Sequence, residues 1–488
     1  MSIATQEQTV VDKVEKRLYI GGEWRDAAGG TLEVEDPATG EAIAEVADAS
    51  PEEAMTALDA AVEAQSSWKD VPAIERGEIL RRAFEKLTER ADELALLMTL
   101  EMGKPVAESK AEIAYAAEFF RWFSGEATRI HGQYNIGGNG VGRVLTLKQP
   151  IGPSIMITPW NFPMAMGTRK IGPALAAGCT IVMKPASQTP LSMLALAQIL
   201  EESGLPGGVL NVITSSSSGR TMEPLIRDPR ARKLSFTGST EVGRVLLEQA
   251  AEQILKVSME LGGNAPFLVF EDADLDAAVE GALLAKMRNI GEACTAANRF
   301  HVAEPVAEEF AKKLADKMGA LKVGRGTEED VKVGPLINQD AIDKVEELVG
   351  DAREKGAKVV VGGQSVDGAG YFYEPTVLGD VPPSARLLEE EIFGPVAPVT
   401  SFESEEDAIE AANNTQFGLV AYVFTSNFKR AIRVIEGLET GMVGLNQGMV
   451  SNAAAPFGGW KWSGIGREGG FEGIEEYLET KYVAVNMD

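Results

Sequence analysis

The chain has 488 residues, of which 44% are hydrophobic and 24% charged, and its formal net charge is −27. This length exceeds what one hydrophobic core fills, so two or three domains are expected, and the acidic surface excludes nucleic acid and anionic membranes as general partners. No run of about 18 apolar residues occurs, which excludes a membrane-spanning helix.

Cysteine and histidine usage narrows the chemistry further. Two cysteines are too few for a disulfide framework, and the segment M-S-I-A-T-Q-E-Q-T-V has neither the basic nor the apolar part of a secretory signal, so we expect a cytoplasmic protein. The two histidines, His131 and His301, are far apart in the chain. We therefore expect no His/Cys metal site, and so no bound metal. We also expect no catalytic Cys–His dyad.

The first 150 residues predict short strands, then helices, then a β excursion. Residues 17–46 contain turn signals typical of an antiparallel edge. Ser50 and Glu53 have the spacing of a capping box at the start of a helix, and two more amphipathic helices are expected over 74–101 and 107–123. Residues 131–150, with G-G-N-G-V-G followed by R-V-L-T-L-K, have no helical period and predict an extended excursion.

Alternating strands and helices dominate the rest of the chain. From 151 to 270 the strand candidates are S-I-M-I-T, T-I-V-M-K, V-L-N-V-I, K-L-S-F and F-L-V-F. Helical segments between them indicate a doubly wound parallel sheet, the usual seat of a nucleotide, and a second α/β unit is expected up to about residue 444. The apolar tail T-K-Y-V-A-V has no strand partner nearby in sequence, which favours an oligomer.

Three side chains are candidates for catalysis, and each has a structural alternative. Cys294, in M-R-N-I-G-E-A-C-T-A-A-N-R, is either a packed thiol or a nucleophile. Asn161, in T-P-W-N-F-P, is either a turn residue or an oxyanion donor. Glu260 closes the strand K-V-S-M-E, where partial burial would raise its pKa and suit it as a general base; the alternative is a solvated strand end.

Cofactor signals are present but individually weak. The fingerprint G-x-G-x-x-G is absent, and the segment T-G-S-T-E-V-G, with Gly238 and Gly243 at a helix start, suits either a pyrophosphate or an ordinary turn. Lys184 ends a strand at the edge where parallel sheets bind ligands, or is simply exposed there. Ser187 is small and neutral, which leaves room for the 2′-phosphate of NADP.

Together, T-P-W-N-F-P, F-T-G-S-T, M-E-L-G-G-N-A-P, G-E-A-C-T and E-I-F-G-P-V resemble the aldehyde dehydrogenase superfamily over nearly the whole chain. The resemblance implies Cys294 as nucleophile, Glu260 as base, and Asn161 with the Cys294 N–H as oxyanion hole. It implies a cofactor site formed by Thr158, Pro159, Trp160, Lys184, Ser187, Gly238, Ser239, Leu261, Glu391 and Phe393. The implied domains are a dinucleotide-binding domain (1–130 and 151–259), a catalytic domain (260–460) and a small β oligomerisation arm (131–150 and 461–488).

Within the superfamily the chain is most similar to succinate-semialdehyde dehydrogenases, through K-P-A-S-Q-T-P, M-R-N-I-G-E-A-C and V-S-N-A-A-A-P-F-G-G. This implies oxidation of succinate semialdehyde with NADP, or NAD, through a cysteine thiohemiacetal and thioester, in a homodimer or homotetramer. Arg169, Arg288 and Ser451 would bind the distal carboxylate of the aldehyde, although either arginine can instead make an internal ion pair. Glutarate semialdehyde, an aromatic aldehyde, or a catalytically inactive relative are the alternatives.

Several positions depart from the subfamily pattern. The loop T-S-S-S-S-G-R (214–220) replaces a more glycine-rich family segment near the adenosine end, so the family's cofactor contacts there are not carried over. Glu292 replaces a common glutamine and places a carboxylate two residues from Cys294, where it can alter the thiol pKa. Ala296 replaces the second cysteine that some members use for a regulatory disulfide. Trp460 and Trp462 add bulk that would reshape a pocket near Ser451.

Overall fold

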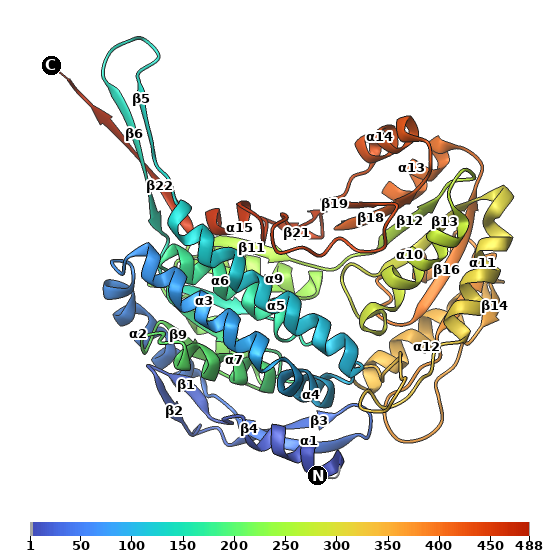
Figure 1. The fold of residues 1–488 in the computed structure, drawn as a ribbon, viewed down its shortest axis with the longest axis horizontal. Helices are drawn as coiled ribbons and strands as arrows, with labels where there is room; N and C mark the ends of the chain where they lie inside the picture. Colours follow the sequence, from blue (N-terminus) through green and yellow to red (C-terminus); the bar gives the residue numbers. More distant parts are fainter. Residues whose placement is uncertain (1–2, 488) are drawn as a thin grey trace.

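Two α/β bodies stand side by side in the structure, a computed structural model that describes residues 3–487 (Figure 1). The first contains an eight-stranded sheet in the order β2-β1-β9-β8-β7-β10-β11-β21, and the second a seven-stranded sheet in the order β14-β15-β16-β13-β12-β18-β19. A three-stranded arm projects from the first body (Figure 1). The predicted fold class, a doubly wound unit with a second α/β unit and a small β arm, is confirmed.

The first sheet is built around parallel strands that are mostly buried, as expected for strands covered on both faces. These strands are β7 (Ser154–Ile157), β8 (Ile181–Lys184), β9 (Leu210–Val212), β10 (Lys233–Thr237) and β11 (Lys256–Glu260). Antiparallel strands close the two edges, namely β1 (Leu18–Ile20), β2 (Glu23–Arg25) and β21 (Gly464–Ile465). The antiparallel edge expected from residues 17–46 is therefore present.

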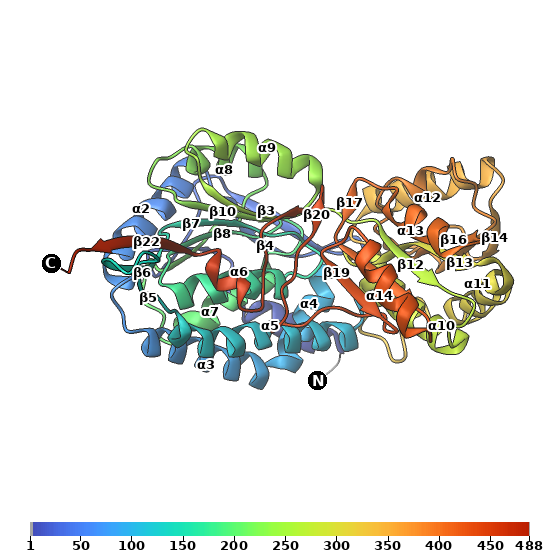
Figure 2. The ribbon, with the colours of Figure 1, turned by 90° about the horizontal axis from the view of Figure 1, so that it is seen from above.

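Helices cover both faces of this sheet (Figure 2). One face carries α2 (Pro51–Trp68), α8 (Ser218–Ile226) and α9 (Thr240–Ala251). The other carries α3 (Ala73–Glu89), α4 (Ala91–Met102), α5 (Val106–Glu126), α6 (Ala165–Ala177) and α7 (Leu191–Glu202). The capping box predicted from Ser50 and Glu53 is formed at the start of α2.

The second body wraps helices around its own sheet. Its strands are β12 (Ala265–Val269), β13 (Ala297–Ala303), β14 (Lys358–Val361), β15 (Thr376–Gly379), β16 (Val396–Phe402), β18 (Val420–Phe424) and β19 (Met442–Leu445). Its helices are α10 (Leu275–Met287), α11 (Glu304–Gly319), α12 (Gln339–Glu354), α13 (Glu405–Asn413) and α14 (Phe428–Gly437). Only the β14–β15 pair is antiparallel among the pairs described for this sheet.

Two predictions about the elements were wrong. The segment F-L-V-F was placed in the first sheet, but it lies in β12, which pairs with β13 and β18 of the second sheet. The helix expected over 74–101 is two helices, α3 and α4, which meet at Arg90, where ψ is 14° and the helical hydrogen-bond ladder breaks. No glycine or proline marks this break in the sequence.

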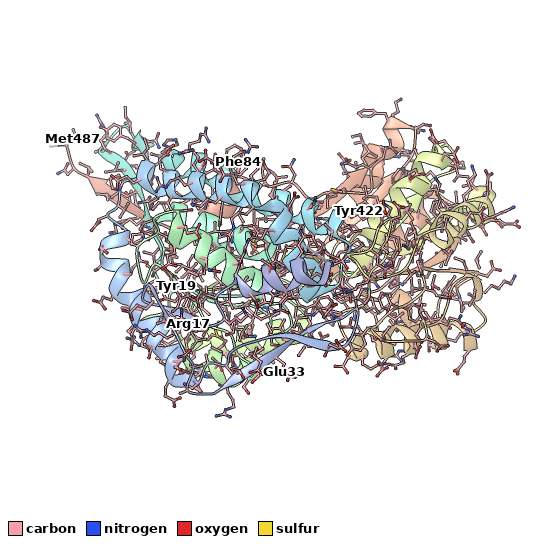
Figure 3. The ribbon with its side chains drawn as sticks, turned by 60° about the horizontal axis from the view of Figure 1, so that its bottom comes forward. Arg17, Tyr19, Glu33, Phe84, Tyr422 and Met487 are labelled. Carbon is pink, nitrogen blue, oxygen red and sulfur yellow. The ribbon has the colours of Figure 1, made fainter. Side chains whose placement is uncertain are left out.

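The arm consists of β5 (Gln133–Ile136), β6 (Arg143–Pro150) and β22 (Leu478–Val485). β22 pairs antiparallel with β6 from Leu478↔Pro150 to Val485↔Arg143, and Met487 marks its far end in Figure 3. The terminal strand has no partner nearby in sequence, as expected, and its partner β6 lies more than 300 positions earlier, within the excursion expected over 131–150. β21 lies within the predicted arm range 461–488, but it pairs with β11 of the first sheet and is not part of the arm.

The remaining elements are short connectors: α1 (Ile3–Asp12), β3 (Thr31–Asp36), β4 (Glu41–Ala47), η1 (Ala127–Arg129), η2 (Arg288–Gly291), η3 (Arg386–Leu388), β17 (Phe417–Gly418), β20 (Trp460–Lys461) and α15 (Glu472–Glu475). Within residues 3–487, no helix combines the length and the apolarity needed to cross a bilayer.

Candidate active site

Cys294 lies in a tight loop between α10 and β13. Asn289 and Ile290 have left-handed backbones, with φ of 54° and 63°, and Gly291 follows with φ of 81°. A Cβ at Gly263 would lie 2.4 Å from the carbonyl oxygen of Cys294, so only glycine lets the segment after β11 approach this closely. The loop therefore fixes the Cys294 backbone beside the carboxyl end of β11.

The Cys294 thiol is half-buried, and its pKa is raised to about 12. Burial is the largest cause; Arg169 and Arg288 act against it, whereas Glu391 and Glu260 raise the pKa further. A thiol with this pKa is almost entirely protonated at neutral pH, so its reaction requires a base or added positive charge. Since the main charge effects come from these four groups, an effect of Glu292 on the thiol is not supported.

Glu260 ends β11 and is 2% exposed. Neither of its carboxylate oxygens has a hydrogen-bond partner among the described residues. Burial and then the carboxylate of Glu468 raise its pKa well above the usual range, with Arg169 and Lys170 opposing them. The predicted burial and raised pKa are confirmed, and a carboxyl in this state is suited to accept and release protons near neutral pH.

Asn161 lies in the loop between β7 and α6 and is 4% exposed. Its Nδ2 donates to the carbonyl of Glu292 at 2.9 Å, and its Oδ1 accepts from the N–H of Phe162 at 3.1 Å. The backbone carbonyl of Asn161 accepts from Lys104 Nζ at 2.7 Å and from Asn289 Nδ2 at 3.2 Å. An amide has two N–H groups, so one of them remains for an oxyanion.

Glu292 joins the Cys294 loop to the segment before α12. Its carbonyl accepts from both Asn161 and Asn289, the latter at 2.8 Å, and its Oε1 accepts from the N–H of Ile337 at 3.1 Å. Its Oε2 is buried and has no partner among residues 3–487. Burial raises the pKa of Glu292 well above normal, although the Ile337 N–H and Lys104 lower it. Burial therefore favours the neutral form of this carboxyl.

Arg169, on α6, is held in an internal ion pair. Its guanidinium forms a buried salt bridge with Glu468, which also pairs with Lys170 at 2.5 Å, and its Cζ lies 4.1 Å from the centroid of the Phe457 ring. Burial would lower the pKa of Arg169, but Glu468 outweighs it and the pKa is raised. Nη2 of Arg169 has no hydrogen-bond partner in the described part of the chain. The internal ion pair, which is the alternative to substrate binding by Arg169, is thus present, and Nη2 remains for a ligand.

Arg288 and Ser451 are brought together across 163 positions of sequence. Nη1 of Arg288 donates to Oγ of Ser451 at 2.9 Å. The guanidinium lies 4.9 Å from the centroid of the Phe162 ring and 5.9 Å from that of Tyr115. No carboxylate of residues 3–487 forms a salt bridge with Arg288, so its positive charge is available to a ligand.

Trp460 and Trp462 lie away from the Arg288–Ser451 pair. The ring of Trp462 lies under the guanidinium of Arg244 on α9, 4.1 Å from its Cζ, and Trp460 lies in β20, which pairs with β17. Both are about half exposed. The expectation that Trp462 reshapes a pocket near Ser451 is not supported, because its ring stacks on α9.

Lys184 at the carboxyl end of β8 has the properties of a ligand-binding cation. It is 3% exposed, and its side chain forms neither a hydrogen bond nor a salt bridge among the described residues. Burial lowers its pKa to about 8, although Asp48 raises it. Thr158, after β7 in the same sheet, also buries a hydroxyl without a partner. Unpaired buried donors at adjacent strand ends fit the ribose hydroxyls of a dinucleotide.

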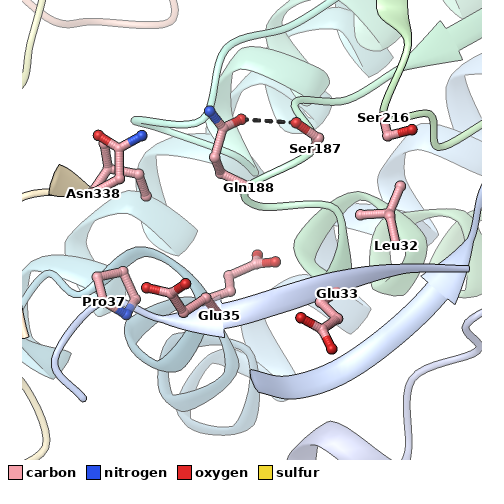
Figure 4. Close-up of a pocket in the computed structure, with 10 residues that line it drawn as sticks. Leu32, Glu33, Glu35, Pro37, Ser187, Gln188, Ser216 and Asn338 are labelled. Atoms are coloured by element: carbon pink, nitrogen blue, oxygen red, sulfur yellow. Dashed lines mark hydrogen bonds between the residues drawn. The ribbon is translucent and has the colours of Figure 1, made fainter. Parts of the chain in front are cut away.

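Ser187 lies on a cavity of about 350 Å³ between the loop after β8 and strand β3 (Figure 4). Its Oγ donates to Oε1 of Gln188 at 3.2 Å. The cavity is lined by Leu32, Glu33, Glu35, Pro37, Glu101, Ser187, Gln188, Ser216, Ile337 and Asn338. It therefore offers room beside Ser187, but its described lining includes carboxylates and no lysine or arginine.

The turn between β10 and α9 is built for a close approach of the backbone. Ser239 caps α9, accepting the N–H of Val242 at 3.3 Å, and Gly238 donates its N–H to the carbonyl of Glu260 at 3.0 Å. A Cβ at Gly243 would lie 2.5 Å from Leu261, so glycine lets α9 pack against the segment after β11. The N-terminus of α9 thus lies beside Glu260, where its dipole favours an anion such as pyrophosphate.

Glu391 and Phe393 reach the same region from the second body. Oε1 of Glu391 accepts from the N–H of Gly263 at 3.0 Å, and burial raises the pKa of Glu391 to about 7. The ring of Phe393 lies edge-on to Trp160, with 5.4 Å between their centroids. Both expected nicotinamide residues therefore face the segments that follow β7 and β11. Pro159 precedes Trp160 in the first of these.

Sequence reasoning missed the buried charges that support these residues. Glu112 of α5 accepts from the N–H groups of Met164 and Ala165 at 3.0 and 3.1 Å, which anchors the start of α6, and it pairs with Lys104 at 2.5 Å. Glu468 holds Arg169. A charged residue inside an apolar helix face was the only available signal for Glu112, and nothing local pointed to Glu468.

Comparison with known proteins identifies the family and several relatives. A model described as the aldehyde dehydrogenase family matches residues 24–483. The succinate-semialdehyde dehydrogenase of Paenarthrobacter nicotinovorans is 58% identical, covering 91% of this chain and 98% of that protein. The NADP(+) succinate-semialdehyde dehydrogenase GabD of Escherichia coli (strain K12) and the glutarate-semialdehyde dehydrogenase of Pseudomonas putida are each 52% identical, covering 97% of this chain and 98% of theirs.

A solved structure has nearly the same fold. A crystal structure described as an E. coli NADP-dependent enzyme superposes with a TM-score of 0.96 at 52% sequence identity, covering 97% of this chain and 98% of that one. The likeness therefore extends over both bodies and the arm.

Proposed function

Because the chain belongs to the aldehyde dehydrogenase family, we propose that it oxidises succinate semialdehyde to succinate, with NADP, or NAD in its place, as the hydride acceptor. The observation that carries the substrate assignment is Arg288, a guanidinium without an anionic partner that donates to Ser451 and lies close enough to Cys294 to lower its pKa. A carboxylate at the far end of a short aldehyde would pair with this cation.

In the first step, Sγ of Cys294 attacks the aldehyde carbon and the C=O π pair moves to oxygen. The free N–H of Asn161 and the backbone N–H of Cys294 would donate to this oxyanion. The thiol proton must leave before attack, and Glu260, whose carboxylate influences the thiol, is the nearby base. Loss of one oxyanion donor typically costs about 3 to 4 kcal/mol of barrier.

Collapse of the oxyanion then expels hydride and leaves a thioester on Cys294. A nicotinamide dinucleotide, when bound, supplies the acceptor for this hydride. Glu260, after releasing the thiol proton to solvent, would next take a proton from water, whose oxygen attacks the thioester carbon; the leaving thiolate then recovers that proton from Glu260 as the carboxylic acid is released. The net change is aldehyde, oxidised cofactor and water to carboxylic acid, reduced cofactor and one proton. Both oxygens of Glu260 are free of hydrogen bonds, which suits this exchange.

The residues proposed to hold the cofactor fit a dinucleotide by their unused donors. Lys184 and Ser187 would meet the adenosine ribose, and Gly238 and Ser239 would face the pyrophosphate at the start of α9. Thr158, Pro159, Trp160, Leu261, Glu391 and Phe393 would surround the nicotinamide end. The resemblance to the E. coli NADP(+) enzyme supports NADP as the preferred form, and the small, neutral Ser187 leaves room for the 2′-phosphate.

The residues proposed to bind the substrate differ in whether a carboxylate of the protein neutralises them. We assign Arg288 and Ser451 as the primary ligands of the distal carboxylate, since Arg288 lacks an internal anion. Arg169 is neutralised by Glu468 and would contribute through its unpaired Nη2. Replacing Arg288 with alanine would therefore affect the KM for succinate semialdehyde more than that for an uncharged aldehyde.

The second candidate substrate is glutarate semialdehyde, one methylene longer. The P. putida relative named for this substrate is as similar as the E. coli enzyme, which favours it over an aromatic aldehyde. A catalytically inactive relative is disfavoured because Cys294, Glu260 and Asn161 are all present.

The assembly and location follow the same reasoning. We propose a homodimer or homotetramer joined through the arm, and a cytoplasmic location, supported by two cysteines that are both free thiols. The proposed domains are 1–130 with 151–259, 260–460, and the arm.

A panel of aldehydes assayed with NADP and with NAD tests the function. We expect the highest kcat/KM for succinate semialdehyde with NADP, a lower value for glutarate semialdehyde, and the lowest for butanal, which has the same chain length as succinate semialdehyde but no carboxylate. Equal values for succinate semialdehyde and butanal would contradict the substrate assignment. No activity with any aldehyde would support the inactive alternative.

A further inference from the structure

Tyr115, on α5, has a hydroxyl that the reaction as described does not use. This hydroxyl is buried and makes no hydrogen bond of ordinary length and angle within residues 3–487. Polar groups that are buried in native proteins are almost always hydrogen-bonded, so an unsatisfied one calls for an explanation. The ring itself is fixed by Phe119, which lies edge-on with 4.9 Å between centroids. The hydroxyl is therefore held in place without a bond that would justify its burial.

The groups around this hydroxyl are the donors assigned to the substrate. The guanidinium of Arg288 lies 5.9 Å from the centroid of the Tyr115 ring. Burial raises the pKa of Tyr115, while the charges of Arg169 and Arg288 and the polar contacts of the hydroxyl with Arg169 and Ser451 lower it, so the hydroxyl lies among these three side chains. Four elements, namely α5, α6, η2 and the loop between β19 and β20, thus direct polar side chains to one point.

A carboxylate at that point would have more lone pairs than two donors can satisfy. Each of its two oxygens accepts two hydrogen bonds, and Ser451 already accepts one from Arg288. The phenol O–H of Tyr115 can donate a hydrogen bond, so it stabilises a bound ligand only if that ligand places an acceptor beside it. An aldehyde without a distal carboxylate would offer the Tyr115 O–H no acceptor.

We propose that Tyr115 is a specificity-determining residue that donates its O–H to the distal carboxylate of the semialdehyde, alongside Arg288 and Ser451. This inference rests on the proposed function and adds an uncharged donor to the ligands assigned there. It makes the substrate preference depend on a neutral donor as well as on charge. The hydroxyl has no part in the steps at Cys294, so it affects binding and not chemistry.

Tyr115→Phe removes the oxygen and keeps the ring. We expect kcat/KM for succinate semialdehyde to fall about ten- to a hundredfold, mainly through KM, because a hydrogen bond to a charged group is lost. The value for butanal should stay within about twofold of wild type, which also shows that the variant is folded. The inhibition constant of succinate against butanal oxidation should rise by a similar factor. Tyr134→Phe, which deletes a tyrosine hydroxyl on β5 of the arm, is the matched control. It should change neither kcat/KM for succinate semialdehyde nor the inhibition constant of succinate.

The outcomes separate this inference from the proposed function. If wild-type enzyme prefers succinate semialdehyde and Tyr115→Phe keeps that preference in full, Tyr115 is not a ligand and the inference is overturned alone. Equal losses for both aldehydes would assign Tyr115 a structural role and overturn it as well. If wild-type enzyme has no preference for succinate semialdehyde over butanal, the proposed substrate fails and the inference fails with it.

Discussion

At Cys294, burial works against the chemistry that the residue is proposed to perform. Burial is the largest cause of its raised pKa of about 12, and the carboxylates of Glu391 and Glu260 add to it. The two arginines on the substrate side have the opposite effect. The raised pKa keeps the thiol largely protonated, which slows its oxidation and alkylation, and the charges of the surrounding groups set its reactivity.

The alkylation rate of Cys294 by iodoacetamide in the absence of ligands should rise about tenfold per pH unit from pH 7 to 9. A thiol below its pKa gains thiolate in this proportion, and a pKa of about 12 places the whole range on the rising limb. Loss of dehydrogenase activity with time measures the rate. A Cys179→Ala variant should behave identically, since Cys179 is buried. A plateau near pH 8 would show that the thiol pKa is ordinary.

Ser187 is the residue on which the NADP preference depends. Ser187→Glu would place a carboxylate where the 2′-phosphate is proposed to lie, and like charges in contact cost several kcal/mol. We expect kcat/KM for NADP to fall at least about tenfold, while that for NAD is unchanged or higher. Ser66→Glu, on the exposed face of α2, controls for added charge. Unchanged NADP kinetics would mean that residue 187 does not face the phosphate.

At the scale of elements, α6 is positioned by a buried charge and not by a local cap. Its own N-cap, Met164, has no side-chain acceptor, and Glu112 of α5 accepts the first N–H groups in its place. α6 carries Arg169 and Lys170, so this contact ties the start of the substrate helix to α5, which carries Tyr115. A single carboxylate thus fixes two helices of the proposed site relative to each other.

Glu112→Ala should destabilise the protein by about 3 to 5 kcal/mol, because it leaves Lys104 buried without a counter-ion and removes the acceptor at α6. Glu118→Ala on the same helix breaks an exposed pair with Arg121 and should cost about 1 kcal/mol or less. Chemical denaturation of the two variants measures the difference. Equal losses would show that the buried pair does not anchor α6.

Glu292 couples the nucleophile loop to the segment before α12, and its raised pKa makes that coupling depend on pH. In the unfolded chain the carboxyl ionises near about pH 4.3. Above that pH the folded state holds its proton and the unfolded state does not, so stability falls as pH rises until the folded carboxyl also ionises.

Glu292→Gln removes this loss while keeping an acceptor for the Ile337 N–H. We expect the variant to melt at a higher temperature than wild type at pH 7 to 8, with the advantage shrinking toward pH 5. Thermal melts across this range test it, with the exposed Glu389→Gln as control. An advantage that grows as pH falls would show that Glu292 is ionised in the folded protein.

The elements that the sequence predicted well are those whose pattern is local. Ser50 and Glu53 mark the start of α2, and β7, β8 and β10 are short, mainly apolar runs that are buried along nearly their whole length. The break at Arg90 could not be predicted, because it follows from packing and no glycine or proline marks it. β12 reads like its neighbours in sequence, and only tertiary pairing assigns it to the second sheet.

At the scale of the whole molecule, the site is made from segments that no local pattern relates. Cys294, Glu260 and Asn161 were identifiable from their motifs, since each lies at a strand end or loop with a characteristic sequence. The Arg169–Glu468 pair spans almost 300 positions, and the partner of β22 lies more than 300 positions away. Such pairs depend on how the chain returns across the first sheet, which periodicity does not encode.

The arm is the part of the chain that most clearly indicates an oligomer. Its three strands leave the body, and Tyr134, Ile136, Leu147 and Tyr482 expose 62%, 62%, 40% and 61% of their surfaces. β5 and β22 are also the two outer strands of this small sheet, so each has an unpaired edge within the described chain. Exposed apolar strands with open edges are stable in water when another chain covers them.

Ile136→Lys combined with Leu147→Lys should therefore dissociate the oligomer. Fully burying each such side chain is worth about 1.5 to 3 kcal/mol, and in a symmetric dimer every substitution occurs twice, so four apolar contacts are lost and four charges are introduced. Light scattering should give a multiple of the chain mass for wild type and the mass of a single chain for the variant. Ile254→Lys, at an 89% exposed position beyond α9, controls for added charge and should leave the mass unchanged. A monomeric wild type would refute the oligomer itself. An oligomer that survives both arm substitutions would instead place the interface elsewhere, because the arm strands would then remain exposed in the assembly.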